Sequence, residues 1–543
     1  MTSSPPLEIE LKLALPPQQV DAFLRRMARR RSEPVRQALH TLYFDTPDFA
    51  LSAQGVALRV RRAGRRWLQT LKTEGERAGG LSRRVEFEMP VGRGVPDWGR
   101  FPPEARAWVP EALRDRLVPV FETRFHRTAW LLKGKGGAQI EVALDVGEVL
   151  AGERSQPICE IELELKSGRP DALFDLALDW AAAFDCLPFD ISKAERGVRL
   201  AHGTADAPVK PVPLMLDGGM GVEDGFAAIV QACLAQFQAN LPGVLSPLVD
   251  PLTIRLSPQA GKSLVIPNPP LGAGEGAKAG PKPIDDSEYV HQARVALRRL
   301  RAALRLMRKA CAPPDELTAG LRTLAAALGP ARDWDVLCGE TLPAIAPHCP
   351  DAGAWQRGMQ ALEAHRAEVR AAMRDALMQA RPGAWLLAFQ RWLLQRGWRT
   401  VPQEQRLLQL SPLDAWARRA LQKGHRPVVR GARNFGKLAA EKRHALRIAI
   451  KRQRYAAEFF ESLFGKGHAR RQGRYLRALR MAQDSLGRAN DAHIAQGLLT
   501  AAGLEPGPMG DFVLGWLAAQ QAEAADDARG GQVRALLELK AYW

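Results

Sequence analysis

The stretch Glu8-Ile9-Glu10-Leu11-Lys12 carries charged side chains at alternate positions, with apolar residues between them. Because neighbouring side chains of a β-strand point to opposite faces of a sheet, this pattern predicts a strand with one charged and one apolar face. The alternation recurs in Arg59-Val60-Arg61, Gln69-Thr70-Leu71-Lys72, Glu86-Phe87-Glu88 and Glu160-Ile161-Glu162-Leu163-Glu164. The N-terminal part of the chain is therefore predicted to form a sheet with a charged face.

The clustered charges on this face need an explanation. For one strand, an antiparallel sheet with one face in water explains such a pattern. Several such strands follow one another in the sequence, and Glu141 and Asp145 add the same alternation on a further strand. Together they favour a closed antiparallel barrel with a polar lumen and with helices over its apolar exterior. Carboxylates on neighbouring strands repel each other, and hard cations such as Mg²⁺ take oxygen ligands. We therefore expect a tunnel that holds a divalent cation and phosphates.

These residues resemble the CYTH superfamily, the triphosphate tunnel metalloenzymes. Glu8-x-Glu10-x-Lys12 is similar to the ExExK signature of that family, and the resemblance extends over residues 7–200. Its further landmarks are Tyr43-Phe44-Asp45-Thr46, Ala57-Leu58-Arg59-Val60-Arg61, Leu71-Lys72-Thr73, Glu122-Thr123-Arg124-Phe125-x-Arg127, Glu141-Val142-Ala143-Leu144-Asp145-x-Gly147-Glu148, Ile158-Cys159-Glu160-Ile161-Glu162-Leu163-Glu164-Leu165-x-Ser167-Gly168 and Ser192-Lys193-Ala194-x-Arg196-Gly197. The set looks most like the bacterial inorganic triphosphatases, which implies hydrolysis of inorganic triphosphate to diphosphate and phosphate.

Roles follow from the chemistry of the reaction, because breaking the terminal anhydride requires neutralised phosphate charges and a water placed in line. The predicted phosphate-binding residues are Arg59, Arg61, Lys72, Arg124, Arg127, Lys193 and Arg196. The predicted ligands of one or two Mg²⁺ or Mn²⁺ ions are Glu8, Glu10, Glu160, Glu162 and Glu164. The resemblance implies that the same tunnel is lined by the catalytic residues Lys12, Glu86, Glu88, Glu141 and Asp145. Glu88 and Glu164 lie at strand ends and are equally compatible with ordinary rim residues.

Length and composition predict more than one domain. The chain has 543 residues, which exceeds what a single core usually fills. The alternation ends at a Pro/Gly-rich stretch, so we place a tunnel domain at 1–205, a linker at 206–219 and a helical domain at 220–543, with a flexible loop at about 257–285. A net charge of +18 predicts an anionic partner, which is polyphosphate, nucleic acid or a membrane surface.

Cysteine usage and the N-terminus bear on location. The six cysteines include no CxxC pair, which is typical of a reducing compartment. The N-terminal residues lack a signal-peptide pattern, and no apolar run approaches the roughly 20 residues that a spanning helix needs. We expect a cytoplasmic, unprocessed protein with no membrane partner.

The helical part contains an internal repeat. The segment from His291 to Arg301 aligns with the segment from His444 to Arg454, and Leu328-Gly329-Pro330-Ala331-Arg332-Asp333 aligns with Leu486-Gly487-Arg488-Ala489-Asn490-Asp491. At helical spacing the basic residues share one stripe in each copy: His291, Arg294, Arg298, Arg301 and Arg305 in the first, and His444, Arg447, Lys451 and Arg454 in the second. No acidic residue interrupts 291–309 or 442–454, so both stripes are predicted to bind an external anion.

The repeat resembles the CHAD domain, the conserved histidine α-helical domain, which is a pair of duplicated helical bundles linked to inorganic polyphosphate. The resemblance covers roughly residues 220–543, and the long loop before His291 departs from it. It implies polyphosphate as a partner. Because a histidine recurs at the first position of both stripes, we interpret it as a phosphate contact rather than as a residue that hydrogen-bonds a neighbouring carbonyl. Nucleic acid is disfavoured, because Tyr455 is the single aromatic residue near the stripes that is available for base stacking.

Two classes of function stay open. The first is a metal-dependent triphosphatase with a polyphosphate-binding module. The second is a catalytically reduced barrel in a polyphosphate-targeting protein. The intact ExExK motif and the retained basic positions favour the enzyme. Hydrolysis of thiamine triphosphate or a nucleotide, or cyclisation of a nucleotide, would need a site for the organic group, and the sequence gives no clear sign of one.

Overall fold

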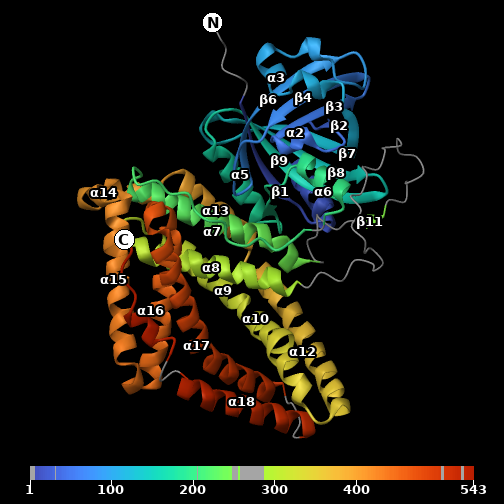
Figure 1. The fold of residues 1–543 in the computed structure, drawn as a ribbon. Coiled ribbons are helices and arrows are strands. Elements are labelled where there is room, and N and C mark those ends of the chain that lie inside the picture. Colours follow the sequence, from blue (N-terminus) through green and yellow to red (C-terminus); the bar gives the residue numbers. More distant parts are fainter. Residues whose placement is uncertain are drawn as a thin grey trace. The chain divides into compact units, whose positions relative to one another are not determined.

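The structure is a computed structural model that describes residues 7–30, 32–204, 206–246, 255–256, 286–502, 507–527 and 531–543 (Figure 1). The chain forms two compact units. Unit 1 consists of Met1–Pro208, Leu241–Asp285 and Arg381–Gln395, and unit 2 consists of Val209–Asn240, Asp286–Ala380 and Arg396–Trp543. The loop predicted at about 257–285 lies outside the described residues. Within the described ranges, none of the helices combines the length and the hydropathy that crossing a membrane requires.

Unit 1 is built on an antiparallel barrel. In the described residues the strands follow one another around it as β1 (Leu7–Ala14), β6 (Leu81–Val91), β4 (Arg66–Thr73), β3 (Val56–Ala63), β2 (Val35–Asp45), β7 (Val118–Lys133), β8 (Gln139–Ala151) and β9 (Arg154–Ser167). Pairing of β1 with β9 closes the barrel. Outside this ring the described part of the chain forms three short strands: β5 (Glu76–Ala78), β10 (Leu187–Pro188) and β11 (Arg255–Leu256). The predicted closed antiparallel barrel is confirmed.

The register of the strands puts charge inside the barrel. In the β1–β9 pair, Glu10 lies opposite Glu164 and Lys12 opposite Glu162. The residues between them point outward, and Leu11 is fully buried. This apolar exterior is covered by α1 (Val20–Ala28) and α5 (Asp171–Ala181) on one side and by α2 (Ala50–Ala53) and α3 (Pro103–Ala107) on another. Burial of apolar side chains under these helices therefore fixes which side chains enter the lumen.

Two further helices of unit 1 bear on the site. α6 (Lys193–His202) is preceded by Ser192, whose hydroxyl accepts a hydrogen bond from the backbone N–H of Glu195, as an N-cap does. α13 (Pro382–Leu394) comes from the helical part of the sequence but belongs to unit 1. Lys193 is the first residue of α6, and its side chain points into the barrel.

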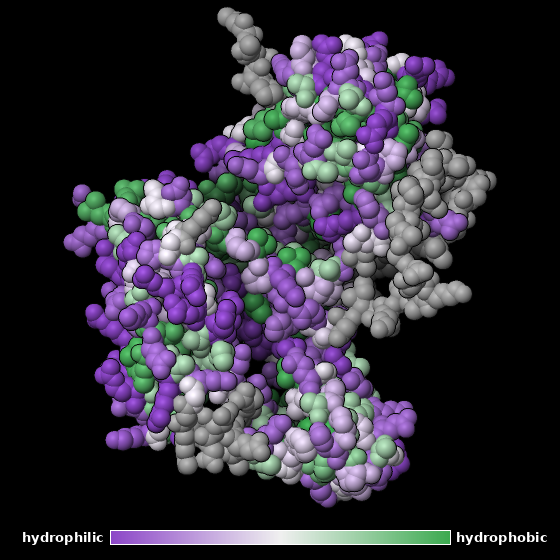
Figure 2. All heavy atoms as spheres, in the orientation of Figure 1, coloured by the Kyte–Doolittle hydropathy of each residue, from purple (hydrophilic) through white to green (hydrophobic). Residues whose placement is uncertain are grey.

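Unit 2 is helical, as predicted. Its principal helices are the first part of α7 (Val222–Leu245), α8 (Ser287–Met307), α9 (Asp315–Ala327), α10 (Gly329–Val336), α12 (Ala352–Gln379), α15 (Leu413–Arg433), α16 (Ala440–Phe459), α17 (Ala469–Ala501) and α18 (Pro508–Asp527). Shorter ones are α11 (Leu342–Ile345) and α14 (Gln403–Leu410). On the face drawn in Figure 2, the surface of both units is predominantly hydrophilic.

Candidate functional site

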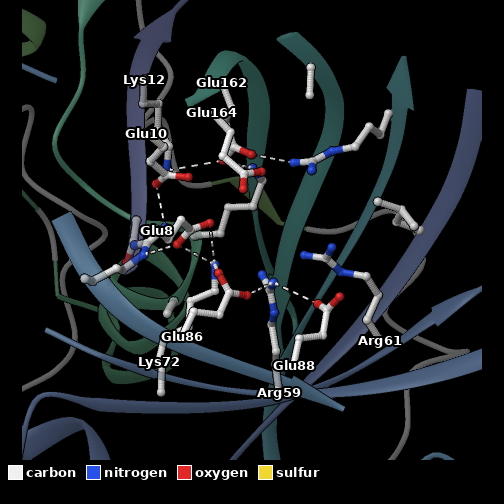
Figure 3. Close-up of a pocket in the computed structure, with 18 of the residues that line it drawn as sticks. Glu8, Glu10, Lys12, Arg59, Arg61, Lys72, Glu86, Glu88, Glu162 and Glu164 are labelled. Carbon is white, nitrogen blue, oxygen red and sulfur yellow. Dashed lines mark hydrogen bonds and ion pairs between the residues drawn. The ribbon is translucent and has the colours of Figure 1, made fainter. Parts of the chain in front are cut away.

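A cavity of about 720 Å³ lies inside the barrel. Figure 3 shows charged side chains from several strands, among them Glu8, Arg59 and Glu162, pointing towards one another across it. The sequence-predicted residues that line it are Glu8, Glu10, Lys12, Arg59, Arg61, Lys72, Glu86, Glu88, Arg127, Glu141, Glu162, Glu164 and Lys193. The structure therefore brings together most of the residues that the strand alternation selected.

Three predicted residues lie in the wall behind this lining. Asp145 and Glu160 are almost completely buried, and both accept hydrogen bonds from Lys193. Arg196 is 1% exposed, and its guanidinium donates to the side chain of Gln156 at 2.9 Å and lies 3.4 Å from Glu160. These three residues therefore lie behind the cavity lining, and their predicted roles stay predictions.

Arg124 lies on the outer face of the barrel. It is three positions from Arg127 along β7, and residues an odd number of positions apart point to opposite faces of a strand. Its guanidinium donates to Glu122 at 2.7 Å, and Glu122 also lies 2.5 Å from His40. The prediction that Arg124 shares the tunnel with Arg127 is therefore wrong, because strand parity separates the two side chains.

Lys193 is held by three carboxylates. Its Nζ donates to Asp145 at 2.7 Å, to Glu162 at 2.9 Å and also to Glu160. Burial alone would lower the pKa of Lys193, but the three carboxylates raise it above its ordinary value. Their oxygens lie within 4.8 Å of one another, a separation that metal ligands also have. The single charge of Lys193 offsets only one of the three negative charges, and Arg127 and Arg196 pair with the same carboxylates. Because these oxygens also have the spacing of a metal site, the role of Glu160 as a metal ligand stays a prediction.

Arg84 is a tunnel residue that the sequence analysis missed. Its guanidinium donates to Glu8 at 2.7 Å and to Glu10 at 2.5 Å. Lys72 holds the same region from the other side, at 3.0 Å from Glu8 and 2.8 Å from Glu86. The signal for Arg84 was present, since it precedes Glu86 by two positions on the same strand and therefore faces the same lumen.

Among the described residues that line the cavity, Arg61 is a cation without an acidic partner within 4 Å. It makes no ion pair within 4 Å with any described residue. Burial and the neighbouring charges of Arg59 and Arg127 lower the pKa of Arg61 to about 10. The buried Nε atoms of Arg59 and Arg61 also have no hydrogen-bond partner in the described part of the chain. An anion bound at Arg59 and Arg61 would match the charge of Arg61 and accept hydrogen bonds from these donors.

The opposite side of the cavity is crowded with carboxylates. Burial raises the pKa of Glu164, and the charges of Glu8 and Glu141 raise it further, although Lys166 lies 2.7 Å away and lowers it. A cation among these oxygens would relieve the repulsion, and an all-oxygen donor set is what Mg²⁺ and Mn²⁺ prefer. The side chains at this end therefore fit a hard divalent cation.

The cavity is close to neutral as a whole. Among the described residues that line it, ten are acidic and nine are basic. A triphosphate carries several negative charges, so net attraction by the protein alone does not account for its binding. A divalent cation that arrives with the anion or before it would supply the missing positive charge.

A second basic site lies in unit 2, where the two predicted stripes meet. α8 packs against α16, and burial together with the charges of Arg447 and Arg298 lowers the pKa of Lys451 to about 8. Arg298 belongs to the first stripe and Lys451 to the second, so the copies of the repeat contribute to one cluster. We call Arg294, Arg298, Arg447 and Lys451 the basic cluster.

The paired turn motifs of the repeat also approach each other. Burial raises the pKa of Asp333, and the charge of Asp491 raises it as well, whereas Arg294 lowers it. Arg447 lies 3.9 Å from Asp491. The Nε atoms of Arg294 and Arg447 are buried and have no hydrogen-bond partner among the described residues. The basic cluster thus holds donors that the protein leaves unused.

The remaining stripe residues lie differently. Burial lowers the pKa of His291, and the charge of Arg332 lowers it further. Arg301, Arg305 and His444 are exposed, and Arg454 pairs with Glu458 at 2.9 Å. The outer ends of the stripes are therefore open to water. The side chains of the second turn motif between Gly487 and Asp491 lie outside the described residues.

Comparison with known proteins agrees with this architecture. The family model of the CYTH domain matches residues 6–198, and that of the CHAD domain matches residues 275–500. The chain therefore contains a CYTH domain followed by a CHAD domain, as the sequence motifs predicted.

Individual relatives cover parts of the chain. An inorganic triphosphatase from Haemophilus influenzae is 37% identical over 201 residues, which are 36% of this chain and 54% of that protein, so the chain matches about half the length of this relative. The crystal structure of the CHAD domain from the plant Ricinus communis has 28% identity and a TM-score of 0.48, and the match covers 62% of this chain and 99% of that one. A putative adenylyl cyclase from Hippeastrum, reported to have a dominant triphosphatase activity, has 19% identity and a TM-score of 0.27, over 37% of this chain and 97% of that one.

Proposed function

We propose that the barrel hydrolyses inorganic triphosphate to diphosphate and phosphate with the help of Mg²⁺ or Mn²⁺. The observation that carries the proposal is the unpaired Arg61, which lies beside Arg59 and Arg127 in the same cavity as a wall of carboxylates. A triphosphate needs guanidinium groups for its oxygens and cations for its remaining charge. The match of the barrel region to an inorganic triphosphatase supports the same substrate class.

The carboxylates Glu8, Glu10 and Glu164 would hold the cation, with Glu141 and Glu162 close by. When bound, the cation neutralises phosphate charge and lowers the pKa of a coordinated water. Arg84 and Lys72 fix the orientation of Glu8 and Glu10 before any ligand arrives. Such preorganisation avoids reorientation of the ligand groups during the reaction.

Different basic residues of the cavity would bind different parts of the triphosphate. Arg59, Arg61 and Arg127 bind phosphate oxygens, with Arg61 free to pair and Arg127 already fixed by Asp145 at 2.8 Å. Lys12 lies 3.5 Å from Glu162 and 4.0 Å from Glu10, so its positive charge offsets the repulsion between these two carboxylates. Enclosure by the barrel limits bulk water around the anhydride.

Phosphate release from a panel of substrates tests this assignment. Purified full-length protein is incubated with Mg²⁺ and inorganic triphosphate, thiamine triphosphate, ATP or long-chain polyphosphate, with and without EDTA. We expect the fastest release from inorganic triphosphate and its loss in EDTA. Release from none of them would favour the alternative of a catalytically reduced binding barrel, and faster release from an organic triphosphate would identify that class as substrate.

Replacing Arg61 by Ala is expected to raise the KM for triphosphate by about tenfold or more, because a hydrogen bond to a charged group contributes about 1.5 to 3 kcal/mol. Arg62→Ala is the matched control, since Arg62 lies on the same strand but points outward and donates to the carbonyl of Gly64. Steady-state kinetics with saturating Mg²⁺ measures both. Equal effects of the two substitutions would contradict a phosphate contact at Arg61.

We further propose that unit 2 binds inorganic polyphosphate through the basic cluster. The converging stripes of α8 and α16 and the unused buried donors of Arg294 and Arg447 support this proposal. We also propose a cytoplasmic location, which the six unpaired cysteines support.

Polyphosphate affinity is expected to fall as the pH rises above about 8. The pKa of Lys451 is lowered to about 8 by burial and by Arg447, Arg298 and Arg454, against the opposing charge of Asp491. A bound polyanion favours the ammonium, so above this pH binding must take up a proton and weakens. Binding curves from pH 7 to 10 measure this. Lys451→Arg keeps the charge at every pH in the range, so a pH dependence that persists unchanged in this variant would contradict the assignment to Lys451.

A further inference from the structure

We infer that α13 is a positioning element of the tunnel, which fixes the backbone of Lys12 through β10 and the turn at Gly79 and Gly80. The activity readout of this inference rests on the proposed triphosphatase function. The helix lies within the sequence range that matches the CHAD domain, yet it belongs to the same compact unit as the barrel. A segment of the second domain thus completes the first.

Close packing joins α13 to the barrel. Leu387 is fully buried in the core cluster formed by α1, α5 and the outer faces of the strands. Gly383 makes the closest approach, because a Cβ added there would lie 1.8 Å from the carbonyl oxygen of Cys186. Arg391 pairs with Asp175 of α5 at 2.8 Å. A contact of this closeness, which only glycine permits, sets the distance between α13 and the segment that leads into β10.

The segments under α13 are the ones that hold Lys12. The backbone N–H of Lys12 donates to the carbonyl of Gly80 at 2.8 Å, and its carbonyl accepts from the N–H of Phe189 at 3.0 Å. β10 immediately precedes Phe189 and pairs with the end of β1. Gln390 of α13 is buried against the turn, since a Cβ added to Gly79 would lie 2.1 Å from its Cγ. α13 therefore packs against both partners of the Lys12 peptide groups.

The start of α13 is held in place within unit 1. Arg381 before the helix has φ +48° and Arg396 after it has φ +51°, a left-handed conformation that residues other than glycine rarely adopt. Arg381 donates to the carbonyls of Ala181 and Ala182 at the end of α5. Such backbone conformations persist where the surroundings fix them, so α13 is anchored rather than loosely tethered.

The test uses the full chain with Gly383→Ala and Gln390→Ala, and with Leu394→Ala as the control, because Leu394 is 37% exposed on the same helix. We expect each of the first two to lower kcat for triphosphate by about tenfold, since misplacement of a group by about 1 Å is enough for such a loss. Hydrogen exchange should also quicken at the amide of Lys12, while the control behaves as wild type. Gln390→Ala removes side-chain atoms only and covers the case in which Gly383→Ala fails to fold.

Several outcomes would overturn the inference. One is wild-type kcat together with wild-type protection of the Lys12 amide in both variants. Another is faster exchange spread evenly over all barrel strands, which would mean that α13 supports overall stability without positioning Lys12. If the wild-type protein releases phosphate from no substrate, the proposed function fails, but the exchange measurement still tests the role of α13.

Discussion

Replacing Glu8 and Glu10 together by Gln is expected to lower triphosphate turnover by about a thousandfold, which corresponds to roughly 4 kcal/mol of lost transition-state stabilisation. Gln keeps the size of the side chain but removes the charge that would bind the cation. The two carboxylates lie on the charged face of β1 and are held by Arg84 at 2.7 and 2.5 Å. Turnover with saturating Mg²⁺, measured on protein whose circular dichroism matches wild type, checks the expectation.

A matched control removes two carboxylates from elsewhere on the barrel. Glu76 and Glu153 are exposed, and Gln at both positions removes the same charge outside the cavity. Because Arg84 loses both of its charged partners and Lys72 loses one of two when Glu8 and Glu10 become Gln, the melting temperature of this variant should also fall. Near-wild-type turnover in a folded protein with Gln at positions 8 and 10 would contradict the assignment of a cation site to this face of β1.

Strand alternation was sufficient to predict the lumen. The charges of Glu8, Glu10 and Lys12 share one face of β1 because they are two positions apart, and the structure places them in the cavity. The same rule would have excluded Arg124 and included Arg84, so these two errors came from relying on motif membership instead of parity. Both corrections were available in the sequence.

Other features depend on contacts that a sequence does not record. Lys193 donates to Asp145 and to Glu162, and these partners come from different strands. The meeting of the stripes at Arg298 and Lys451 depends on how α8 packs against α16. Sequence spacing fixes the face of a helix on which a residue lies, but it does not fix which other helix that face meets.

The membership of α13 in the barrel unit shows the same limit. Its sequence is apolar on almost every side, with Trp385, Leu386, Leu387 and Phe389 all buried. Such a helix is expected to be enclosed by other elements, but periodicity does not identify the core that encloses it. The predicted tunnel domain at 1–205 contains the eight barrel strands, whereas unit 1 also includes the end of α7, β11 and α13.

Changing all four residues of the basic cluster to Ala is expected to abolish binding of long-chain polyphosphate to the full-length protein. Each pair alone, Arg294 with Arg298 or Arg447 with Lys451, should weaken binding by about tenfold or more, since each charge-assisted hydrogen bond contributes about 1.5 to 3 kcal/mol. Loss of both pairs removes the site from both copies of the repeat. In wild type, affinity should fall steeply with salt, and the slope should be smaller in each pair variant because fewer phosphate charges are neutralised.

Removal of four positive charges lowers affinity for any polyanion, so the control must lose the same charge elsewhere on unit 2. Arg322, Arg357, Arg419 and Lys423 of unit 2 are exposed, and none of the four makes an ion pair within 4 Å with a described residue. Their replacement by Ala should leave polyphosphate affinity close to wild type. Equal loss in the control would mean that net charge, rather than the converging stripes, determines binding.

Competition binding separates polyphosphate from nucleic acid as the ligand. If duplex DNA or RNA displaces polyphosphate at equal phosphate concentration, the cluster is a general nucleic-acid site. Weak displacement fits stripes that lack aromatic side chains for stacking bases.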